Sequence, residues 1–367
     1  MSNISNRAPM KAIHYHWRPI ILMGLAVLIV SIFWFTSRYP QLFSKVEHIN
    51  DVLPSMVYSK QIMTVDLNAP IWLRIAASAV NWLNSMKIGM TFGVLFGALL
   101  HTVLRYYPLK LGNNRYLNSV KGALIGVPAG ICANCAVPVI CGMTRGRGRI
   151  EAALGFLFSS PNFNPVVVMM TFMALPLTMS LTKYAILLFL ILVVMPSLIL
   201  WFERDQPFQL LSVEKESGAD IFGLLPKEDM PEHFTKVFHE LAWEYGKHVW
   251  MLFKPTVTLM LFASIISATL LVFIPWDLIL SEVTPLRLAF VSLISVIMPT
   301  PIALDVMFAA QLQRQGVASG YVMLFAMTLG TYSIIPFLYL WREISKPLAV
   351  ALFGFFMALG VILGLLF

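Results

Sequence analysis

The sequence predicts an all-α polytopic membrane protein with about seven to nine spans. We expect two inverted repeats with Pro-broken re-entrant hairpins, plus an extra N-terminal span. Three observations predict this class: the composition, the recurrence of long apolar segments, and a pair of proline-interrupted segments. Of the 367 residues, 58% are hydrophobic and 12% are charged, whereas a soluble domain is about 45–50% apolar and about 25% charged. This composition excludes a soluble globular protein, a disordered chain and a collagen-like fibre.

Seven segments are long and apolar enough to cross a hydrocarbon core of about 30 Å. They are 19–36, 86–105, 150–175, 179–202, 248–274, 317–340 and 347–367. Arg7, Lys11 and Arg18 precede the first one, and no small-residue cleavage site follows it. We therefore expect an uncleaved first span with a cytoplasmic N-terminus, in the inner (plasma) membrane.

Two further segments, 118–142 and 286–310, are apolar but interrupted. The first contains the run Gly126–Gly130 and Pro138, and the second contains Pro299 and Pro301. Proline removes a backbone donor and clashes with the preceding turn, so both segments should be broken helices. Unwound backbone at membrane depth persists only where it lines a cavity or is buried in protein.

The positions of basic residues favour re-entrant hairpins over full crossings. A full crossing by 118–142 would put Arg145, Arg147 and Arg149 outside, against the positive-inside rule. The same rule accounts for the net charge of +8. Because basic runs with interleaved aromatic residues are absent outside the apolar segments, we expect no nucleic-acid partner.

The two halves of the chain have similar layouts. We expect an N-terminal segment and first span at 1–36, repeat one at 69–202, a cytoplasmic loop at 203–231 and repeat two at 232–367. Each repeat begins with an amphipathic helix, 69–85 or 232–247, that leads into a span. The polar break Ser-Ser-Pro-Asn-Phe-Asn-Pro at 159–165 corresponds to Gly-Thr-Tyr-Ser-Ile-Ile-Pro at 330–336. Inverted repeats with paired broken segments are typical of transporters, whose binding site lies where the repeats meet.

All three cysteines, Cys132, Cys135 and Cys141, fall within ten residues. One interpretation is that they are small apolar residues that fill gaps. The other is a soft-ligand site, because thiolates select soft metals and metalloids over hard cations. A trivalent arsenical takes up to three thiolates, so Cys141 is a third possible ligand. Histidines are absent nearby, which argues against structural zinc.

Three polar residues complete the predicted site. Asp305 lies in the second broken segment, where a carboxylate is costly and marks a functional site by default. It is the candidate carrier of a coupling proton, although it could equally face water at the hairpin exit. Asp305 and Cys135 each precede a glycine, Gly316 and Gly146, by eleven residues, so we expect them to approach one cavity. Asn162 and Asn164 offer amides at a helix break and are candidate substrate-binding residues.

Gly89, Gly93 and Gly97 recur every four residues and predict a face for close helix packing.

The stretch Cys132-Ala-Asn-Cys135-Ala-Val-Pro138, the turn Gly146-Arg-Gly148 and the run Ala152–Pro165 resemble the ArsP-like permease family. The resemblance covers 118–175 well and 286–340 in layout. It implies an inner-membrane permease, some of whose relatives export trivalent organoarsenicals through cysteine ligation. The family's thiol positions would map to Cys132 and Cys135, although the family often spaces this pair by one residue rather than two.

We therefore expect a secondary exporter of a soft metal(loid) or thiol-reactive small solute, with no cofactor and no enzymatic activity. The P-loop pattern is absent from the sequence, which argues against ATP drive within this chain. One alternative is a membrane thiol–disulfide oxidoreductase that uses the Cys132/Cys135 pair. Another is a permease for an unrelated small solute. The sequence leaves the oligomeric state open.

Overall fold

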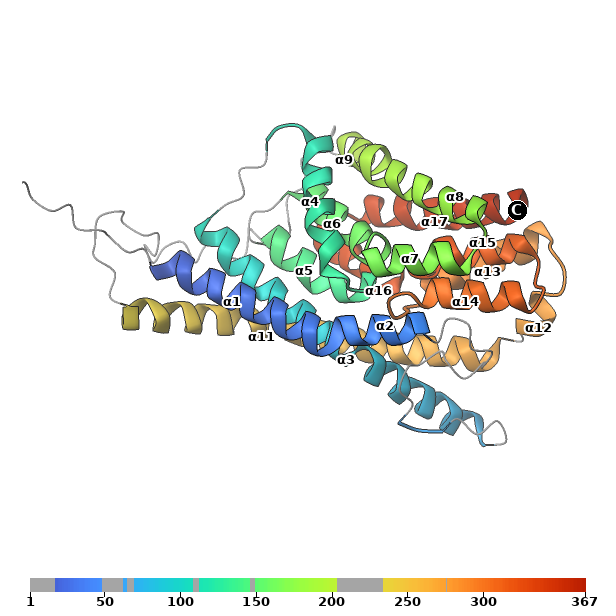
Figure 1. Ribbon diagram of the computed structural model, residues 1–367, viewed down its shortest axis with the longest axis horizontal. Coiled ribbons are helices and arrows are strands. Elements are labelled where there is room, and N and C mark those ends of the chain that lie inside the picture. The colour runs from blue at the N-terminus through green and yellow to red at the C-terminus, as the bar shows by residue number, and fades with distance from the viewer. Residues whose placement is uncertain are drawn as a thin grey trace, which may run out of the picture.

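The computed structural model describes residues 17–47, 62–64, 69–107, 112–145, 149–202, 234–274 and 276–367. This described part folds into helices and contains no strand (Figure 1). Five of its helices are long and apolar enough to cross a membrane, or six if one bent pair counts as a single span. The helical membrane class is thus confirmed, whereas the larger expected number of spans is not.

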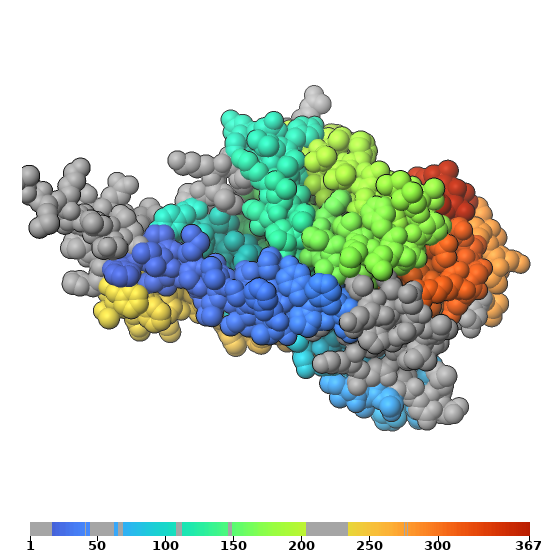
Figure 2. Space-filling view, viewed as in Figure 1, coloured from blue at the N-terminus to red at the C-terminus, as the bar shows by residue number. Residues whose placement is uncertain are grey.

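The first span is longer than predicted. Helix α1 (Trp17–Phe33) continues through a π-helical turn, η1 (Trp34–Arg38), into α2 (Tyr39–Glu47). It packs against α3 (Ile71–Tyr106), where the rings of Phe33 and Phe92 stack with centroids 3.8 Å apart. In Figure 2 this blue segment runs across the front of the molecule and reaches the green region of α7 (Pro165–Ala174).

Two long helices form one side of the molecule. Each predicted amphipathic segment continues without a break into the span that follows it, giving α3 (Ile71–Tyr106) and α11 (Phe234–Phe273). The two lie side by side in Figure 1, and Tyr245 Oη donates to the Leu95 carbonyl oxygen across 3.0 Å. At about 1.5 Å per residue, α11 is roughly 60 Å long, about twice the hydrocarbon thickness.

The first predicted hairpin consists of α4 (Arg115–Ala129) and α5 (Ala133–Arg145). Its break lies at Gly130, whose φ of 58° is left-handed and ends α4. Of the two interruptions that the sequence offers, the run Gly126–Gly130 contains the break, whereas Pro138 lies inside α5 and does not end it. Helix α5 continues through Pro138 to Arg145, although proline inside a helix removes one backbone hydrogen bond and crowds the preceding turn.

The second predicted hairpin consists of α13 (Pro285–Ile297) and α14 (Leu304–Arg314). Its break includes Pro299 and Pro301, as predicted, and ends at Ala303 with a φ of 63°. A four-residue helix, α12 (Trp276–Ile279), connects α11 to this hairpin.

Two predicted spans are broken as well. Segment 150–175 divides into α6 (Ile150–Asn162) and α7, which are bent by 48° at Phe163 and Asn164. Segment 317–340 divides into α15 (Ser319–Thr328) and α16 (Ile334–Tyr339). Both predicted polar motifs therefore lie at helix breaks.

Each half ends with an apolar helix. In the first half α8 (Leu177–Phe189), η2 (Leu190–Val194) and α9 (Met195–Phe202) form one continuous helix. In the second half a π-helical turn, η4 (Leu340–Ile344), precedes α17 (Lys346–Leu366). The order of elements is thus the same in the two halves, while the predicted inversion between them stays a prediction. The expected loop 203–231, the turn Gly146–Gly148 and residues 1–16 lie outside the described part.

The predicted glycine face of α3 packs against α5, which confirms that prediction. A Cβ on Gly93 would lie 2.3 Å from the Cys135 carbonyl oxygen, and a Cβ on Gly97 would lie 2.3 Å from the Pro138 carbonyl oxygen. Any side chain larger than hydrogen at these two positions would push α5 away. The glycines therefore fix the depth at which the first hairpin sits.

Candidate functional site

The four helix breaks meet in the interior, and Asn134 joins three of them. Its Nδ2 donates to the Thr300 carbonyl oxygen in the second hairpin across 3.1 Å. Its Oδ1 accepts from Ser333 Oγ, at the break between α15 and α16, across 2.5 Å. Asn134 itself lies in the first turn of α5, next to the first hairpin break, and is 1% exposed. One buried amide thus ties both hairpins to the last break.

The predicted residue Asn162 connects the remaining break to this centre. It ends α6, where Thr331 Oγ1 donates to its Oδ1 across 3.4 Å and its Nδ2 donates to the Phe158 carbonyl oxygen across 3.0 Å. Asn162 and Thr331 come from the two polar motifs that correspond in sequence. Both are buried, so the two motifs meet in the interior.

The predicted residue Asn164 has a local structural role. Its Oδ1 accepts from the Val166 backbone N–H across 3.1 Å and caps the N-terminus of α7. Its amide nitrogen points the other way, toward the first hairpin: a Cβ on Gly130 would lie 2.7 Å from Asn164 Nδ2. The residue is 2% exposed.

Cys132 and Cys135 are joined by a disulfide in the structure. Cys132 lies in the hairpin break and Cys135 in the first turn of α5, so the bridge closes the turn that starts this helix. The Cys135 backbone N–H points at Cys132 Sγ across 3.2 Å, and Met86 Sδ lies 3.9 Å from the same sulfur. A metalloid could be held by both thiolates only after this bridge is reduced.

Cys141 stays outside the bridge. It is buried in α5, more than one turn beyond Cys135. Within the described residues, groups of three or more His, Cys, Asp and Glu side chains that could hold a metal ion are absent. The structure therefore brings two of the predicted thiols together but not the third.

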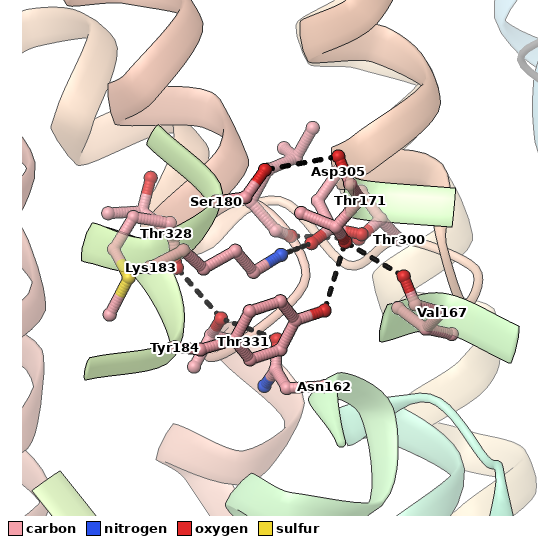
Figure 3. A network of polar contacts seen from close by, with 12 residues as sticks. Asn162, Val167, Thr171, Ser180, Lys183, Tyr184, Thr300, Asp305, Thr328 and Thr331 are labelled. Carbon is pink, nitrogen blue, oxygen red and sulfur yellow. Dashed lines mark hydrogen bonds and ion pairs between the residues drawn. The ribbon is translucent and has the colours of Figure 1, made fainter. Parts of the chain in front are cut away.

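Asp305 lies in the first turn of α14 and is 4% exposed, so it faces the interior rather than water. Its Oδ2 is 2.5 Å from Nζ of Lys183, whose side chain is completely buried in α8 (Figure 3). Asp305 and Cys135 occupy comparable places, each in the first turn of the helix that follows its hairpin break. The sequence correspondence between them is thus reproduced in the local structure.

Lys183 is a site residue that the sequence analysis missed. Its signal was a single lysine inside the apolar segment 179–202, and an ionisable residue in a membrane helix marks a functional site by default. Asn134 was missed too, because an asparagine between two cysteines carries the weaker chemical signal in the sequence.

The ion pair is surrounded by hydroxyl groups that hold α7 and α8 together (Figure 3). Tyr184 Oη donates to Thr171 Oγ1 across 3.0 Å, and Ser180 Oγ donates to the Thr171 carbonyl oxygen across 3.2 Å. On the other side, a Cβ on Gly330 would lie 3.0 Å from Asp305 Cγ. Backbone at the last break therefore approaches the carboxylate directly.

Backbone groups that the breaks leave without helical partners are bonded by side chains. Trp82 Nε1 donates to the Pro299 carbonyl oxygen across 2.9 Å, and Thr300 Oγ1 donates to the Leu329 carbonyl oxygen across 2.8 Å. In the first hairpin the Ile131 backbone N–H donates to Ser160 Oγ across 3.2 Å. Such bonds are required, because an unsatisfied backbone group at membrane depth costs several kcal/mol.

A separate pocket of about 710 Å³ lies between α11, α12, α14 and α15. Its lining is mostly apolar and includes Trp276, Phe308 and Phe325. The predicted site residues do not line it, although Leu304 and Leu329 connect it in sequence to Asp305 and Gly330. We therefore place the candidate site at the meeting of the breaks.

Comparisons with known proteins identify the family of the chain. The family model ArsP_1, described as a predicted permease, matches residues 108–367. The UPF0718 protein YraQ of Escherichia coli (strain K12) is 25% identical over 177 residues. That alignment covers 47% of this chain and 46% of the relative, so the chain spans about half of the relative's length. No solved structure matches the chain.

Proposed function

Because the chain belongs to the ArsP_1 family of predicted permeases, we propose that it is a secondary exporter of a soft metal(loid) or thiol-reactive small solute. Trivalent (organo)arsenicals are the first substrates to test. The proposal places the chain in the inner (plasma) membrane as a multi-pass protein with a cytoplasmic N-terminus. The substrate would bind where the four helix breaks meet.

The observation that carries this proposal is the buried polar centre formed by Asn134, Asn162, Thr300 and Thr331. Breaking four helices at membrane depth requires compensating hydrogen bonds for each one, a cost that a purely structural bundle would not incur. Secondary transporters place such broken helices around the substrate. Both halves contribute breaks, which supports two repeats, 69–202 and 232–367, rocking around one site as an inverted pair.

In this proposal the first hairpin binds the soft atom of the substrate. Once reduced, Cys132 and Cys135 present two thiolates at the start of α5, and Cys141 would add a third only if α5 moved. Asn162 and Asn164 supply amide contacts from the neighbouring break. Thiolates favour soft metalloids over hard cations, which fits a substrate of this class.

The second hairpin supplies the coupling. Asp305 is paired with Lys183 in the structure. Protonation of the Asp305 carboxylate would break the ion pair and leave Lys183 without a charged partner. Gain or loss of one proton would therefore change which arrangement of α8 and α14 is stable. Proton-driven export needs such an element, biased by the coupling ion.

The test is uptake of trivalent methylarsenical, arsenite and antimonite into everted vesicles, kept reduced with dithiothreitol. We expect Cys132→Ser and Cys135→Ser each to abolish transport. Asp305→Asn should abolish the dependence of transport on a proton gradient. Glu343→Gln, which changes a carboxylate at a partly exposed site, should not. The Cys141→Ser variant decides whether this residue is a third ligand. Absence of transport by the wild type for all three solutes would refute the metalloid and leave a permease for an unrelated small solute.

The topology has its own test. A reporter fused within 203–247 should be cytoplasmic. A periplasmic signal would make 118–142 a full crossing and refute the inverted repeat.

The disulfide favours a second candidate function, a membrane thiol–disulfide oxidoreductase. In that reaction a partner dithiol would be oxidised while the Cys132–Cys135 bridge is reduced, with two electrons and two protons passing between them. The chain has three cysteines in all, so a second pair must come from another protein. Two results together would favour the enzyme. The wild type would oxidise a thioredoxin-like dithiol but transport no metalloid, and Cys135→Ser would lose the oxidation of that dithiol.

A further inference from the structure

Arg38 is a buried cation whose charge nothing in the described part of the chain neutralises. It ends the π-helical turn η1 of the first span, a kind of distortion frequent at functional sites. The residue is 6% exposed, and its Nε is buried without a hydrogen-bond partner. The contact that the structure gives its guanidinium is the face of the Phe33 ring, with Cζ 4.8 Å from the ring centroid. Arginine stays protonated in proteins, so the charge persists.

The side chain of Arg38 ends beside the predicted thiol site. A Cβ on Gly89 would lie 2.8 Å from Cys135 Sγ and 3.3 Å from Arg38 Nη2, so both atoms converge on the same point of α3. A Cβ on Gly130 would lie 3.7 Å from Arg38 Cγ. The arginine therefore extends from the first hairpin break to the disulfide.

A second donor, the Asn164 amide, lies beside the stem of the same arginine. Asn164 uses its Oδ1 to cap α7, and its Nδ2 lies against Gly130, close to the Arg38 stem. Acidic side chains among the described residues pair elsewhere: Asp305 with Lys183, Glu151 with Arg115 and Glu343 with Arg145. A guanidinium and an amide N–H₂ without an anionic partner are the donor set of an oxyanion site.

We propose that Arg38 is the anion-binding residue of the substrate site, and that the transported solute carries a carboxylate or another small oxyanion group. The planar Nε and Nη2 edge of the guanidinium binds such a group through two parallel hydrogen bonds. The soft atom of the same solute would then meet Cys135, whose Sγ lies beside the guanidinium next to Gly89. This inference rests on the proposed function in taking the first hairpin as the substrate site. Beyond the proposed function, this inference states the charge of the substrate. It also places a residue of the first span in the site, and that span lies before the segment that the family model matches.

The test is anion-dependent thermal stability of the purified full-length chain in detergent with reductant. Sodium acetate, phosphate and sulfate are compared with sodium chloride at equal ionic strength. We expect at least one oxyanion to raise the melting temperature saturably, by on the order of a few °C. Arg38→Gln should abolish this shift and Arg38→Lys should keep part of it. The matched control is Lys87→Gln, an exposed cation on α3 close to Gly89, which should leave the shift unchanged.

Two results would overturn the proposal: no oxyanion-dependent shift in the wild type, or an equal shift in Arg38→Gln. If Arg38→Gln does not fold, Gly89→Ala decides. Its added methyl group would displace Arg38 and Cys135 without removing the charge, so an undiminished shift in this variant also contradicts the site.

A third result would assign the guanidinium to the thiolate instead. In the Cys132→Ser/Cys141→Ser background, Arg38→Gln could slow alkylation of Cys135 by iodoacetamide at neutral pH while oxyanions have no effect on stability. That pair of results overturns the anion site, because Arg38 would then stabilise a thiolate. The stability assay is independent of transport, so an Arg38-dependent shift without metalloid transport would contradict the proposed substrate and leave the anion site standing.

Discussion

The first hairpin carries two cysteines and no charged side chain at its break, whereas the second carries a carboxylate, Asp305, in the first turn after its break. The backbone layout is otherwise the same, with a helix, a break and a second helix whose first turn enters the polar centre. The partner of Asp305 comes from the first half, through Lys183 in α8. The fold therefore supplies two equivalent positions, and the sequence gives one of them soft, neutral chemistry and the other hard, charged chemistry.

The largest expected effect on stability comes from breaking the ion pair of the second hairpin, between Lys183 and Asp305. Lys183→Met leaves Asp305 buried and unpaired, which should destabilise the fold by about 3–5 kcal/mol. Replacing both partners, as in Lys183→Met/Asp305→Leu, should recover most of that loss. Thermal unfolding of the detergent-solubilised chain measures both, and the exposed lysine variant Lys254→Met should stay within about 0.5 kcal/mol of the wild type. Equal stability of Lys183→Met and the wild type would show that the pair is not formed.

The next effect tests how tightly each hairpin is held. Gly93→Ala would place a Cβ 2.3 Å from the Cys135 carbonyl oxygen, so α5 must shift, at a cost of about 1–3 kcal/mol. Gly330→Ala meets the side chain of Asp305 at 3.0 Å, and a side chain moves more easily than backbone. We expect the second substitution to cost less than the first. Gly354→Ala, with nothing within 4 Å, is the control and should not destabilise. The reverse order would mean that the second hairpin is the more rigid one.

A smaller effect tests whether the two hairpins act as one unit. Asn134→Ala removes the bonds to the Thr300 carbonyl oxygen and to Ser333 Oγ, which should cost about 1–2 kcal/mol. Ser333→Ala removes only the second bond and should cost less. A double-mutant cycle between the two gives their coupling energy. Full additivity would contradict the hydrogen bond between them.

The smallest expected effect on stability comes from a partly exposed ion pair that joins the two halves outside the buried polar centre. Arg145, at the end of α5, pairs with Glu343 in η4 at 3.0 Å, and both side chains are partly exposed. Ion pairs of this kind contribute about 1 kcal/mol or less, and salt screens them. Arg145→Gln should therefore lower stability slightly at low salt and not at high salt. A loss of stability as large as that of Lys183→Met would mean that the Arg145–Glu343 pair, rather than the buried centre, holds the two halves together.

The sequence predicted the helical membrane class, because composition and the length of apolar segments depend on local chemistry alone. It predicted the break at Pro299 and Pro301 for the same reason, since proline acts on its own backbone. It offered two places for the first break, the run Gly126–Gly130 and Pro138, without choosing between them, because the turn depends on the left-handed backbone of Gly130, against which the Asn164 side chain packs. Each amphipathic segment leads into its span as expected, and the structure adds that the two form one unbroken helix, α3 or α11.

For the candidate site, the sequence indicated residues by their chemistry but did not indicate the partners with which these residues interact. Cys132, Cys135, Asn162 and Asp305 were singled out for their chemistry, and all lie at or next to helix breaks. The partners of these residues come from distant parts of the chain: Lys183 is separated from Asp305 by 122 residues and Thr331 from Asn162 by 169. Periodicity within one segment carries no information about such pairs.

The buried pair of Lys183 and Asp305 also determines how the protein responds to an electric field. A movement that carries both side chains together displaces no net charge, so the membrane potential does no work on it. Once Asp305 takes up a proton, the same movement carries one positive charge, and each charge that crosses the full potential contributes about 2.3 kcal/mol per 100 mV. The contribution of this pair to the voltage dependence of conformational exchange should therefore be absent while the pair is intact and appear once the carboxylate is neutral.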